Sequence, residues 1–463
     1  MQKHYDIAVI GAGSAGLVAA TSAKRAGLSV ALLEKNKIGG ECLHTGCVPS
    51  KTFINSAKVY ATAKKTNSFG LPSFVEKDKL DFSKVMEHVN SVVQHIYKDE
   101  NPEVFQKIGI DVYVDQSGAQ FVNSKEIKIG NEIITAEHTI ICTGSSPKRI
   151  ETVDGSYFKF FDNENFWEIR KQPKNILFIG GGIISAEIGQ SLKYFGSKVT
   201  IIDHNERILK VVDKDITDVL IKKFNEDGIK MIPNAEVESF EKKGDSIIAR
   251  IKTTEHEILI MEFDSVFLTA GRIPNTKGMN LENAGIDYDS RWIKTNEYFQ
   301  TTAENIYACG DVSSKFKFTH AASYQADICL NNILNGNSKK MNVNLVPWAI
   351  FTDPEIAHTG LSESESNKLF PNINIFKVDA AIDRFIAEGK TEGFLKLIFD
   401  DKNNIVGADA IGASAGEWIQ IITVAIKNKI SIESIADTIF IYPTFAEIVK
   451  KSFTRFQRSL KQQ

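Results

Sequence analysis

Apolar and polar positions near the N-terminus follow an order that predicts a strand, a turn, a helix and a second strand. An apolar run at 5–10 leads directly into the string GAGSAG at 11–16. A helix is expected over 14–25, and a second apolar run at 29–33 stops at Glu34. This order is typical of one unit of a parallel α/β sheet.

The same order recurs 169 residues further along the chain. Apolar residues at 175–179 precede the string GGGIIS at 180–185, and a helix is expected to end near Gly196. An apolar run at 198–202 then stops at Asp203. A repeat of this size indicates two copies of a whole structural unit rather than a solenoid.

The pattern changes from about Met341 onward, after a polar, linker-like segment at 335–340. The remaining runs are strand-like at 373–379, 393–399 and 405–411, and helical at 415–428 and 443–461. Strands followed by helices predict a separate α+β unit at the C-terminal end.

Composition narrows the classes of function. The chain has 463 residues, of which 43% are hydrophobic and 24% charged, so it is globular and long enough for about three domains. Lys and Arg number 55 against 58 Asp and Glu, so no excess of positive charge supports a nucleic-acid or anionic-membrane partner. No run reaches the roughly 18 apolar residues of a membrane helix.

The cysteines indicate a reducing compartment. An odd, sparse set in a long chain argues against a secreted disulfide scaffold. The apolar run that follows Asp6 is interrupted by glycines, so we interpret it as a buried strand rather than a secretion signal, and we expect a cytoplasmic protein. The five cysteines are Cys42, Cys47, Cys142, Cys309 and Cys329.

Both glycine strings have the spacing of a dinucleotide-binding turn. Gly11 permits the tight turn, Gly13 lets the backbone approach a pyrophosphate, and Gly16 lets helix and strand pack closely. Gly180 and Gly182 take the first two places in the second string. The helix that follows presents its first N–H groups to the phosphates. A turn without a ligand is the alternative, and it would require the same coincidence twice.

An acid stands 18 residues beyond the third position of each string, and these acids are Glu34 and Asp203. The spacing approaches the about 20 residues at which an acid binds ribose hydroxyls. Asp203 would repel a 2′-phosphate, and the next residue is His204 rather than arginine, which favours NADH over NADPH. His204 and Lys210 leave NADPH open. Two dinucleotide sites in one chain imply an electron path between them.

The segment GGECLHTGCVPSK at 39–51 holds Cys42 and Cys47 with four residues between them, so one turn can bring their Cα atoms within disulfide range. Pro49 indicates a helix start just after Cys47, and the helix end together with Lys51 would lower the pKa of a thiol there. A zinc pair would need a second Cys/His pair at ligand spacing. Two ordinary buried thiols are the other alternative, but a catalytic disulfide fits the dinucleotide sites.

With these motifs the chain resembles the class I pyridine nucleotide–disulfide oxidoreductases, the flavoprotein family of lipoamide dehydrogenase, glutathione reductase and mercuric reductase. ICTGSSP at 141–147, TAGRIPN at 269–275 and ACGD at 308–311 also match. The resemblance implies α/β architecture with two Rossmann-like domains, for FAD and NAD, and a C-terminal α+β dimerisation domain. It places the FAD-binding domain at 1–148 and 271–340, the NAD-binding domain at 149–270 and the dimerisation domain at 341–463.

The resemblance also implies roles for single residues. Cys47 would be the flavin-side charge-transfer thiol and Cys42 the interchange thiol that meets substrate, while Lys51 would lie by the flavin N5 and pair with Glu187. Cys142 and Cys309 would be small structural residues, with Cys329 in the core. No metal site is predicted. The cofactor contacts would be Gly11, Gly13, Ser14, Gly16, Glu34, Thr143, Gly144 and Asp311 for FAD, and Gly180, Gly182, Asp203 and Gly271 for NAD.

The C-terminal segment departs from most of this family. Lipoamide dehydrogenases and glutathione reductases carry a His-Pro…Glu arrangement whose histidine, from the partner subunit, is the acid/base for the interchange thiol. This chain has Tyr442 before Pro443 and Glu447. Tyrosine titrates near pH 10 against about 6.5 for histidine, so Tyr442 is a hydrogen-bond donor or a ligand and a poor proton shuttle.

A tyrosine at this place is the mercuric reductase pattern. The chain nevertheless has no cysteine after Cys329 to form the vicinal C-terminal pair of those enzymes, and no N-terminal metal-binding module is expected. Ile183 and Asp203 speak against a glutathione reductase. His44 replaces the usual asparagine of the family in the redox loop, the segment at 39–51. There it either tunes the pKa of Cys42 or binds substrate, or it is a surface turn residue.

We therefore expect a homodimeric enzyme with shared active sites that passes electrons from NADH through FAD and the Cys42–Cys47 disulfide to a disulfide substrate, as dihydrolipoamide dehydrogenases do in reverse. One alternative is a mercuric reductase-like enzyme whose acceptor is a soft metal ion such as Hg(II) or Cu(II), which suits thiolate chemistry. The others are a flavin-only diaphorase and a non-catalytic redox sensor or complex partner.

Overall fold

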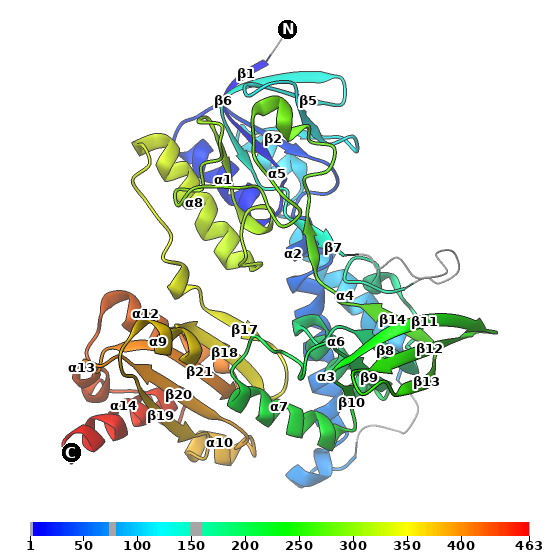
Figure 1. Ribbon diagram of the computed structural model, residues 1–463, viewed down its shortest axis with the longest axis vertical. Helices are drawn as coiled ribbons and strands as arrows, with labels where there is room; N and C mark the ends of the chain where they lie inside the picture. Colours follow the sequence, from blue (N-terminus) through cyan, green and yellow to red (C-terminus); the bar gives the residue numbers. More distant parts are fainter. Residues whose placement is uncertain (1–2, 74–79, 149–159, 463) are drawn as a thin grey trace.

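The computed structural model describes residues 3–73, 80–148 and 160–462. Its larger sheets and their helices form three units, one at the top of Figure 1 and two side by side below it. Two of these sheets contain the predicted strand, glycine string, helix and strand in sequence, so the fold is mixed α/β as predicted.

The first unit is built on a seven-stranded sheet in the order β3-β2-β1-β6-β5-β4, with β16 paired to β6. Strands β1, β2, β3, β6 and β16 are mutually parallel, whereas β5 runs antiparallel to both of its neighbours, β6 and β4. Residues 7–10 of β1 are all buried, which a parallel strand covered on both faces requires. The strands are β1 (Lys3–Ile10), β2 (Val30–Glu34), β3 (Asp111–Val114), β4 (Ala119–Phe121), β5 (Glu126–Ile129), β6 (Glu132–Ile141) and β16 (Ile306–Ala308).

Two helices distant in sequence, α1 (Ser14–Arg25) and α8 (Thr319–Asn335), pack side by side in this unit (Figure 1). Small buried residues such as Ala19 and Ala23 let α1 pack closely against its neighbours. The start of α8 therefore reaches the edge of the sheet where the first glycine string lies.

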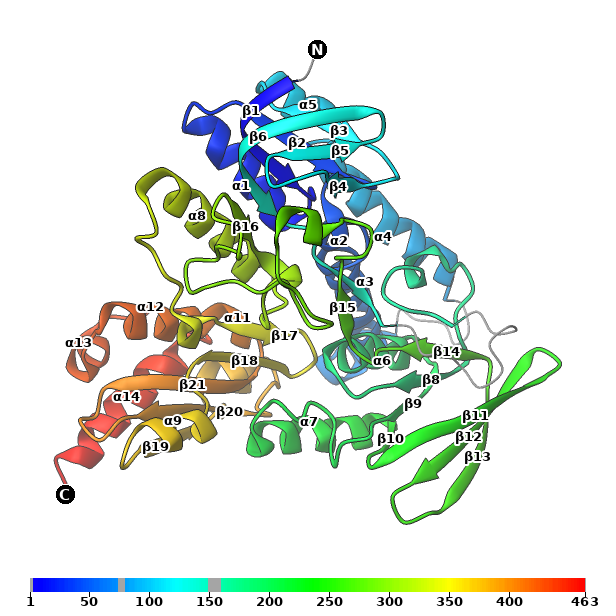
Figure 2. The ribbon, with the colours of Figure 1, turned by 45° about the horizontal axis from the view of Figure 1, so that its top comes forward.

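The second unit contains the second glycine string. Its parallel sheet has the order β10-β9-β8-β14, beside an antiparallel sheet β11-β12-β13. A short ribbon of β7 and β15 joins it to the first unit (Figure 2). The elements are β7 (Ser145–Pro147), β8 (Asn175–Ile179), α6 (Ile183–Phe195), β9 (Lys198–Ile202), α7 (Lys214–Asp227), β10 (Lys230–Ile232), β11 (Ala235–Lys243), β12 (Ser246–Thr253), β13 (Ile258–Phe263), β14 (Ser265–Leu268) and β15 (Arg272–Pro274).

The redox loop forms α2 (Gly40–His44) and the start of α3 (Cys47–Ala63), which packs against α6. Phe53 of α3 is fully buried and meets Phe166 and Phe195 at ring-centroid distances of 5.7 and 5.2 Å. This aromatic packing fixes the redox loop against the second unit. The nearby helices are η1 (Thr66–Phe69), α4 (Phe82–Tyr97), α5 (Pro102–Lys107) and η2 (Phe166–Glu168).

The third unit is an antiparallel sheet in the order β17-β18-β21-β20-β19 with helices packed on it. Its strands are β17 (Trp348–Ile350), β18 (Glu355–Gly360), β19 (Asn374–Asp379), β20 (Phe394–Phe399) and β21 (Ile405–Gly412). Its helices are α9 (Glu363–Leu369), α10 (Asp383–Ala387), α11 (Ala415–Trp418), α12 (Gln420–Asn428), α13 (Ile432–Asp437) and α14 (Glu447–Leu460). The remaining 3-10 turns are η3 (Leu281–Ala284), η4 (Gly310–Val312) and η5 (Val343–Leu345).

Several features of this unit were not predicted. The sequence pattern missed the strands β17 and β18 and the helices α9, α10 and α13, and the helix predicted over 443–461 begins only at Glu447. β18 lacks an apolar signature because it buries His358, whose ring is satisfied by Asp409 on β21. α14 begins late because the Glu447 carboxylate accepts from the N–H of Thr444, which caps the turn before the helix.

Candidate functional site

A cavity of about 1710 Å³ brings the predicted motifs together. Its wall includes the first glycine string, the redox loop, the first turns of α6 and the start of α8. The predicted site residues on this wall are Gly11, Gly13, Ser14, Glu34, Cys42, Cys47, Lys51, Thr143, Gly144, Gly182, Glu187 and Asp311. The predicted residues off it are Gly16, Gly180, Asp203, Gly271, Tyr442 and Glu447.

The first glycine string is shaped by close backbone approach. Gly11 has a φ of +99°, and a Cβ there would lie 2.5 Å from the carbonyl oxygen of Cys142. A Cβ on Gly16 would collide with the carbonyl oxygen of Gly11. Among the described residues no side chain caps the start of α1, so its first N–H groups remain available to an anion such as a pyrophosphate.

The acid after each string holds the string by the same pair of bonds. Glu34 accepts hydrogen bonds from the N–H of Ala12 at 2.6 Å and of Asn36 at 2.7 Å. Asp203 accepts from the N–H of Gly181 at 2.5 Å and of Asn205 at 2.7 Å. The repeat therefore extends to single atoms, and each carboxylate fixes the turn beside which a ribose would lie.

The second string has the same construction. Gly180 has a φ of +106°, and a Cβ there would lie 2.8 Å from the carbonyl oxygen of Thr269. In the described part of the chain no side chain caps the start of α6 at Gly182. These residues fit a second dinucleotide by the same physical argument as the first.

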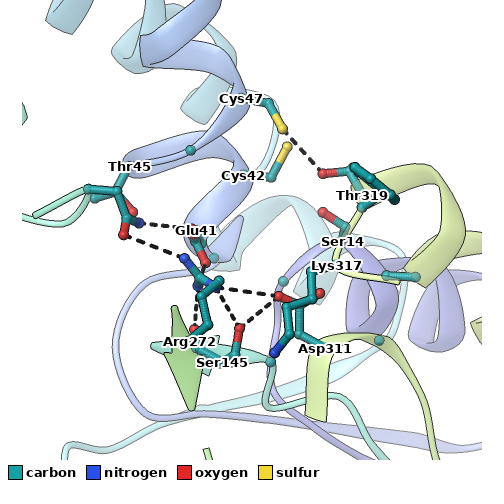
Figure 3. A pocket seen from close by; sticks show the side chains of 18 of the residues that line it. Ser14, Glu41, Cys42, Thr45, Cys47, Ser145, Arg272, Asp311, Lys317 and Thr319 are labelled. Atoms are coloured by element: carbon teal, nitrogen blue, oxygen red, sulfur yellow. Dashed lines mark hydrogen bonds and ion pairs between the residues drawn. The ribbon is translucent and has the colours of Figure 1, made fainter. Parts of the chain in front are cut away.

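The two redox thiols lie side by side in the cavity, as Figure 3 shows, and both are free. Cys42 lies in α2, and Cys47 is the first residue of α3. The Cys47 Sγ is 3.4 Å from the Oγ1 of Thr319, at the start of α8. A hydrogen bond from Cys47 lowers the pKa of Cys42 to about 6, and the same bond raises the pKa of Cys47. The pair therefore carries one thiolate near neutral pH and shares the remaining proton.

An ion pair with a buried carboxylate lies beside the thiols. Lys51 Nζ is 2.9 Å from Glu187 Oε2, and the Glu187 side chain is only 4% exposed. Glu187 Oε1 accepts from the N–H of Phe351 at 2.8 Å, and the ammonium group of Lys51 lies 4.5 Å from the centre of the Phe351 ring. The ion pair thus joins α3, α6 and the third unit at the cavity wall. Its two members, predicted as partners by resemblance, are brought together by the fold.

Sequence reasoning missed a charged network centred on Arg272, which Figure 3 shows. Arg272 forms an ion pair with Glu41, donates to the Ser145 hydroxyl at 2.7 Å and lies 3.7 Å from Asp311. Ser145 in turn donates to Asp311 at 2.7 Å. The network links the redox loop to the ACGD string. An Arg directly after Gly271 and a Glu directly before Cys42 were the available signals.

Two further residues of the site come from the start of α8 and the segment just before it. Burial lowers the pKa of Lys317, which faces Asp311 and Arg272 in the cavity. His320 Nε2 lies 2.7 Å from the carbonyl oxygen of Pro347. Neither residue had a sequence signal beyond its place after the ACGD string.

The remaining predicted residues have structural contacts. Thr143 donates to the carbonyl oxygen of Asn275 at 2.8 Å, and this bond ties the segment ICTGSSP at 141–147 to the segment TAGRIPN at 269–275. The Nε2 of His44 lies 2.8 Å from the carbonyl oxygen of Ile38, and its ring meets Tyr97 edge-on. Tyr442 is 65% exposed and donates to Asp383 at 3.0 Å, away from the cavity of its own chain.

The described residues lack two features that would indicate other functions. No helix in the described ranges is long and apolar enough to span a membrane. Within the same ranges no group of three or more His, Cys, Asp or Glu side chains is placed to hold a metal ion.

Comparison with known proteins agrees with this geometry. Residues 5–326 match the family model described as pyridine nucleotide-disulphide oxidoreductase, and residues 346–453 match its dimerisation domain, which supports a homodimer. A dihydrolipoyl dehydrogenase of Chlamydia pneumoniae is 33% identical over 455 residues, which cover 97% of this chain and 96% of that protein. A mercuric reductase of Staphylococcus aureus is 30% identical over 460 residues, which cover 98% of this chain and 83% of that protein.

A solved structure shares the whole architecture. The HOCl-induced flavoprotein disulfide reductase RclA from Escherichia coli superposes with a TM-score of 0.85 at 27% identity, covering 97% of this chain and 99% of that one. The glycine strings, their uncapped helices and the paired thiols fit the two dinucleotides that this family uses. The chain therefore belongs to the pyridine nucleotide-disulphide oxidoreductases and is an FAD-dependent enzyme that takes its electrons from NAD(P)H.

Proposed function

We propose that this enzyme passes electrons from NADH through FAD and the Cys42–Cys47 pair to a disulfide substrate. The observation that carries the proposal is the dithiol in one cavity with the first glycine string and the Lys51–Glu187 pair. Bound FAD would supply the two-electron relay between the nicotinamide and the disulfide. The residues of the first string, with Glu34 and Asp311, would hold FAD, and those of the second string, with Asp203, would hold NADH.

The thiols then carry out a disulfide exchange. The Cys42 thiolate attacks one sulfur of the substrate, and the other sulfur leaves as a thiolate that takes up a proton. Cys47 attacks the Cys42 sulfur of this mixed disulfide, which releases the second product thiol and leaves the Cys42–Cys47 disulfide. The hydrogen bond with Cys42 raises the pKa of Cys47, and the positive charge of Lys51 partly offsets that rise and would stabilise a thiolate on Cys47.

The donor preference follows from Asp203. Its carboxylate is held at the end of β9 by two backbone N–H groups, and a 2′-phosphate beside it would meet like charge. We therefore expect a higher kcat/KM with NADH than with NADPH.

A second candidate acceptor is a soft metal ion. Tyr442 supports it, because a hydrogen bond to Asp383 raises the pKa of its phenol above 10 and makes it a poorer proton donor than a histidine. Reduction of a metal ion held by thiolates does not need that proton, and thiolates select soft ions. One relative is a mercuric reductase, and the neighbouring reductase RclA has been solved as a Cu(II) complex, with a TM-score of 0.83 at 27% identity.

An anaerobic titration with NADH tests the common part of both candidates. We expect flavin absorbance, a long-wavelength thiolate–flavin band and two additional titratable thiols. Bleaching of the flavin without new thiols would refute the dithiol path and leave the diaphorase alternative. No reaction with NADH at all would favour a non-catalytic redox sensor or complex partner.

The acceptor is then decided by turnover with oxidised lipoamide, Hg(II) and Cu(II). The Cys42→Ser variant should lose turnover with the true acceptor while it keeps NADH-driven reduction of a quinone. Its matched control is Ser50→Ala, which removes a hydroxyl from the first turn of the next helix, α3, and leaves both thiols in place. Equal turnover by wild type and Cys42→Ser would exclude both candidates.

A further inference from the structure

The three cysteines outside the redox loop form a buried cluster. Cys142 follows the end of β6, Cys309 follows the end of β16, and Cys329 lies in α8. Their exposed fractions are 6%, 0% and 0%. None has a part in the exchange reaction proposed above. The fold nevertheless brings them together from three elements, two of which end at the cavity.

The backbone places Cys142 and Cys309 as neighbours. β6 and β16 are parallel, and Ile141 is paired with Ala308, so the two cysteines occupy the next position of each chain. The N–H of Cys309 donates to the carbonyl oxygen of Ile141 at 3.0 Å, which continues the ladder to this point. Paired strands lie about 4.8 Å apart, inside the roughly 4.4–6.8 Å range of Cα separations in disulfides.

The side chains are already in contact. The Sγ atoms of Cys142 and Cys309 are 3.5 Å apart. Rotation about the Cα–Cβ bonds would bring the sulfurs toward the about 2.05 Å of a covalent bond. The hydrogen bond between the two strand ends keeps their backbones close together.

Cys309 is the one of the three whose surroundings favour the thiolate. The thiols of both Cys142 and Cys329 donate to its sulfur, and these bonds lower its pKa against the effect of burial. A thiolate is the nucleophilic form of cysteine. Cys142 lines the cavity, so the pair borders the space from which a small oxidant would come.

We propose that Cys142 and Cys309 form a second redox pair, which a hydroperoxide such as hydrogen peroxide converts to a disulfide. The Cys309 thiolate attacks one peroxide oxygen, which gives a sulfenic acid and hydroxide. The Cys142 thiol attacks the sulfenic sulfur, and its proton leaves with the hydroxyl group as water. The hydroxide takes up the proton that Cys309 lost when it ionised, so in total two thiols lose two electrons and one hydrogen peroxide becomes two waters.

The disulfide would join the two segments that line the cofactor cavity beyond the ends of β6 and β16. Cys142 is followed by Thr143 and Gly144, and Cys309 is followed by Gly310 and Asp311. The carbonyl oxygen of Cys142 also lies against Gly11. A covalent bond here would therefore fix three cofactor-binding segments relative to one another, and we expect slower release of FAD from the oxidised enzyme.

The experiment uses the FAD-loaded protein with Cys42→Ser and Cys47→Ser, so that only the cluster can react. After hydrogen peroxide treatment and alkylation under denaturing conditions, peptide mapping should find Cys142 joined to Cys309 with the loss of two hydrogens. Dithiothreitol should restore both thiols. Adding Cys329→Ser should leave this disulfide in place, whereas adding Cys142→Ser should abolish it.

Other products would overturn the proposal. Three free thiols after treatment, a disulfide between Cys309 and Cys329, or sulfinic acid on Cys309 would each show that Cys142 is not its partner. Mapping on the protein with the three native cluster cysteines keeps the test independent of whether a cluster variant folds. FAD release that is equally fast before and after oxidation would refute the inferred effect on cofactor binding.

Discussion

Lys396 offers a stringent test of how the second and third units are held together. Its side chain is 0% exposed, although it lies on β20 of the C-terminal sheet. Its Nζ is 2.6 Å from Asp213 and 3.1 Å from Asp215, both at the start of α7. It is also 3.4 Å from Glu363 and 3.4 Å from Asp409. These carboxylates outweigh burial and raise the pKa of Lys396, so it stays charged.

We predict that Lys396→Met lowers the free energy of unfolding by about 3–5 kcal/mol, because removal of one partner leaves buried charge uncompensated. Methionine retains most of the side-chain volume, so the loss of charge dominates. Asp409 is 4% exposed and Asp213 is 17% exposed, and both would lose this cation. At about 2–4 °C per kcal/mol for a unit of this size, Tm should fall by roughly 6–20 °C.

Lys377→Met is the matched control. Lys377 contacts the same Asp215 at 2.5 Å, but its side chain is 46% exposed. Exposed pairs contribute about 0.2–1 kcal/mol, so its Tm should fall by less than about 4 °C. The assay is thermal unfolding of both FAD-loaded variants, followed by tryptophan fluorescence and circular dichroism. Equal falls for the two variants, or an unchanged Tm for Lys396→Met, would refute the argument from burial.

Three further predictions concern pH and catalysis. Burial lowers the pKa of His358, but the bond to Asp409 outweighs it and raises that pKa. The contribution of His358 to stability should be fully present below about pH 6.5 and be lost as pH rises through the raised pKa. Urea unfolding at about pH 6 and about pH 9 should show this loss in wild type but not in His358→Gln. Glu187→Gln should slow reduction of the Cys42–Cys47 disulfide roughly 10- to 100-fold, because a charged hydrogen bond contributes about 1.5–3 kcal/mol. Stopped-flow absorbance measures this rate, and an unchanged rate would show that the pair with Lys51 is only structural. Tyr442→His should raise kcat/KM for a disulfide substrate by up to about 10²-fold through acid–base catalysis, whereas a gain for quinones as well would contradict that cause.

The sequence alone determined the repeated units, because their signals are local. Each glycine string needs its residues at fixed positions between a strand and a helix, and that constraint is visible within about 30 residues of chain. The helix at Ser14–Arg25 and the strand at Lys198–Ile202 accordingly have the predicted bounds. The redox cysteines are a local signal in the same sense, since only four residues lie between them. The resemblance to known enzymes added roles that no spacing contains.

Only the tertiary structure decided which distant charges meet. Glu41 and Arg272 are 231 residues apart, and Lys396 is 183 residues from Asp213, yet each pair is in contact. A charged residue in a sequence ordinarily predicts an exposed surface, because burial of an unpaired charge is costly. Whether a partner is present depends on packing between units, which no local pattern records. For the same reason the sequence could identify the thiols at 142, 309 and 329 but could not show that three separate elements bring them into one cluster.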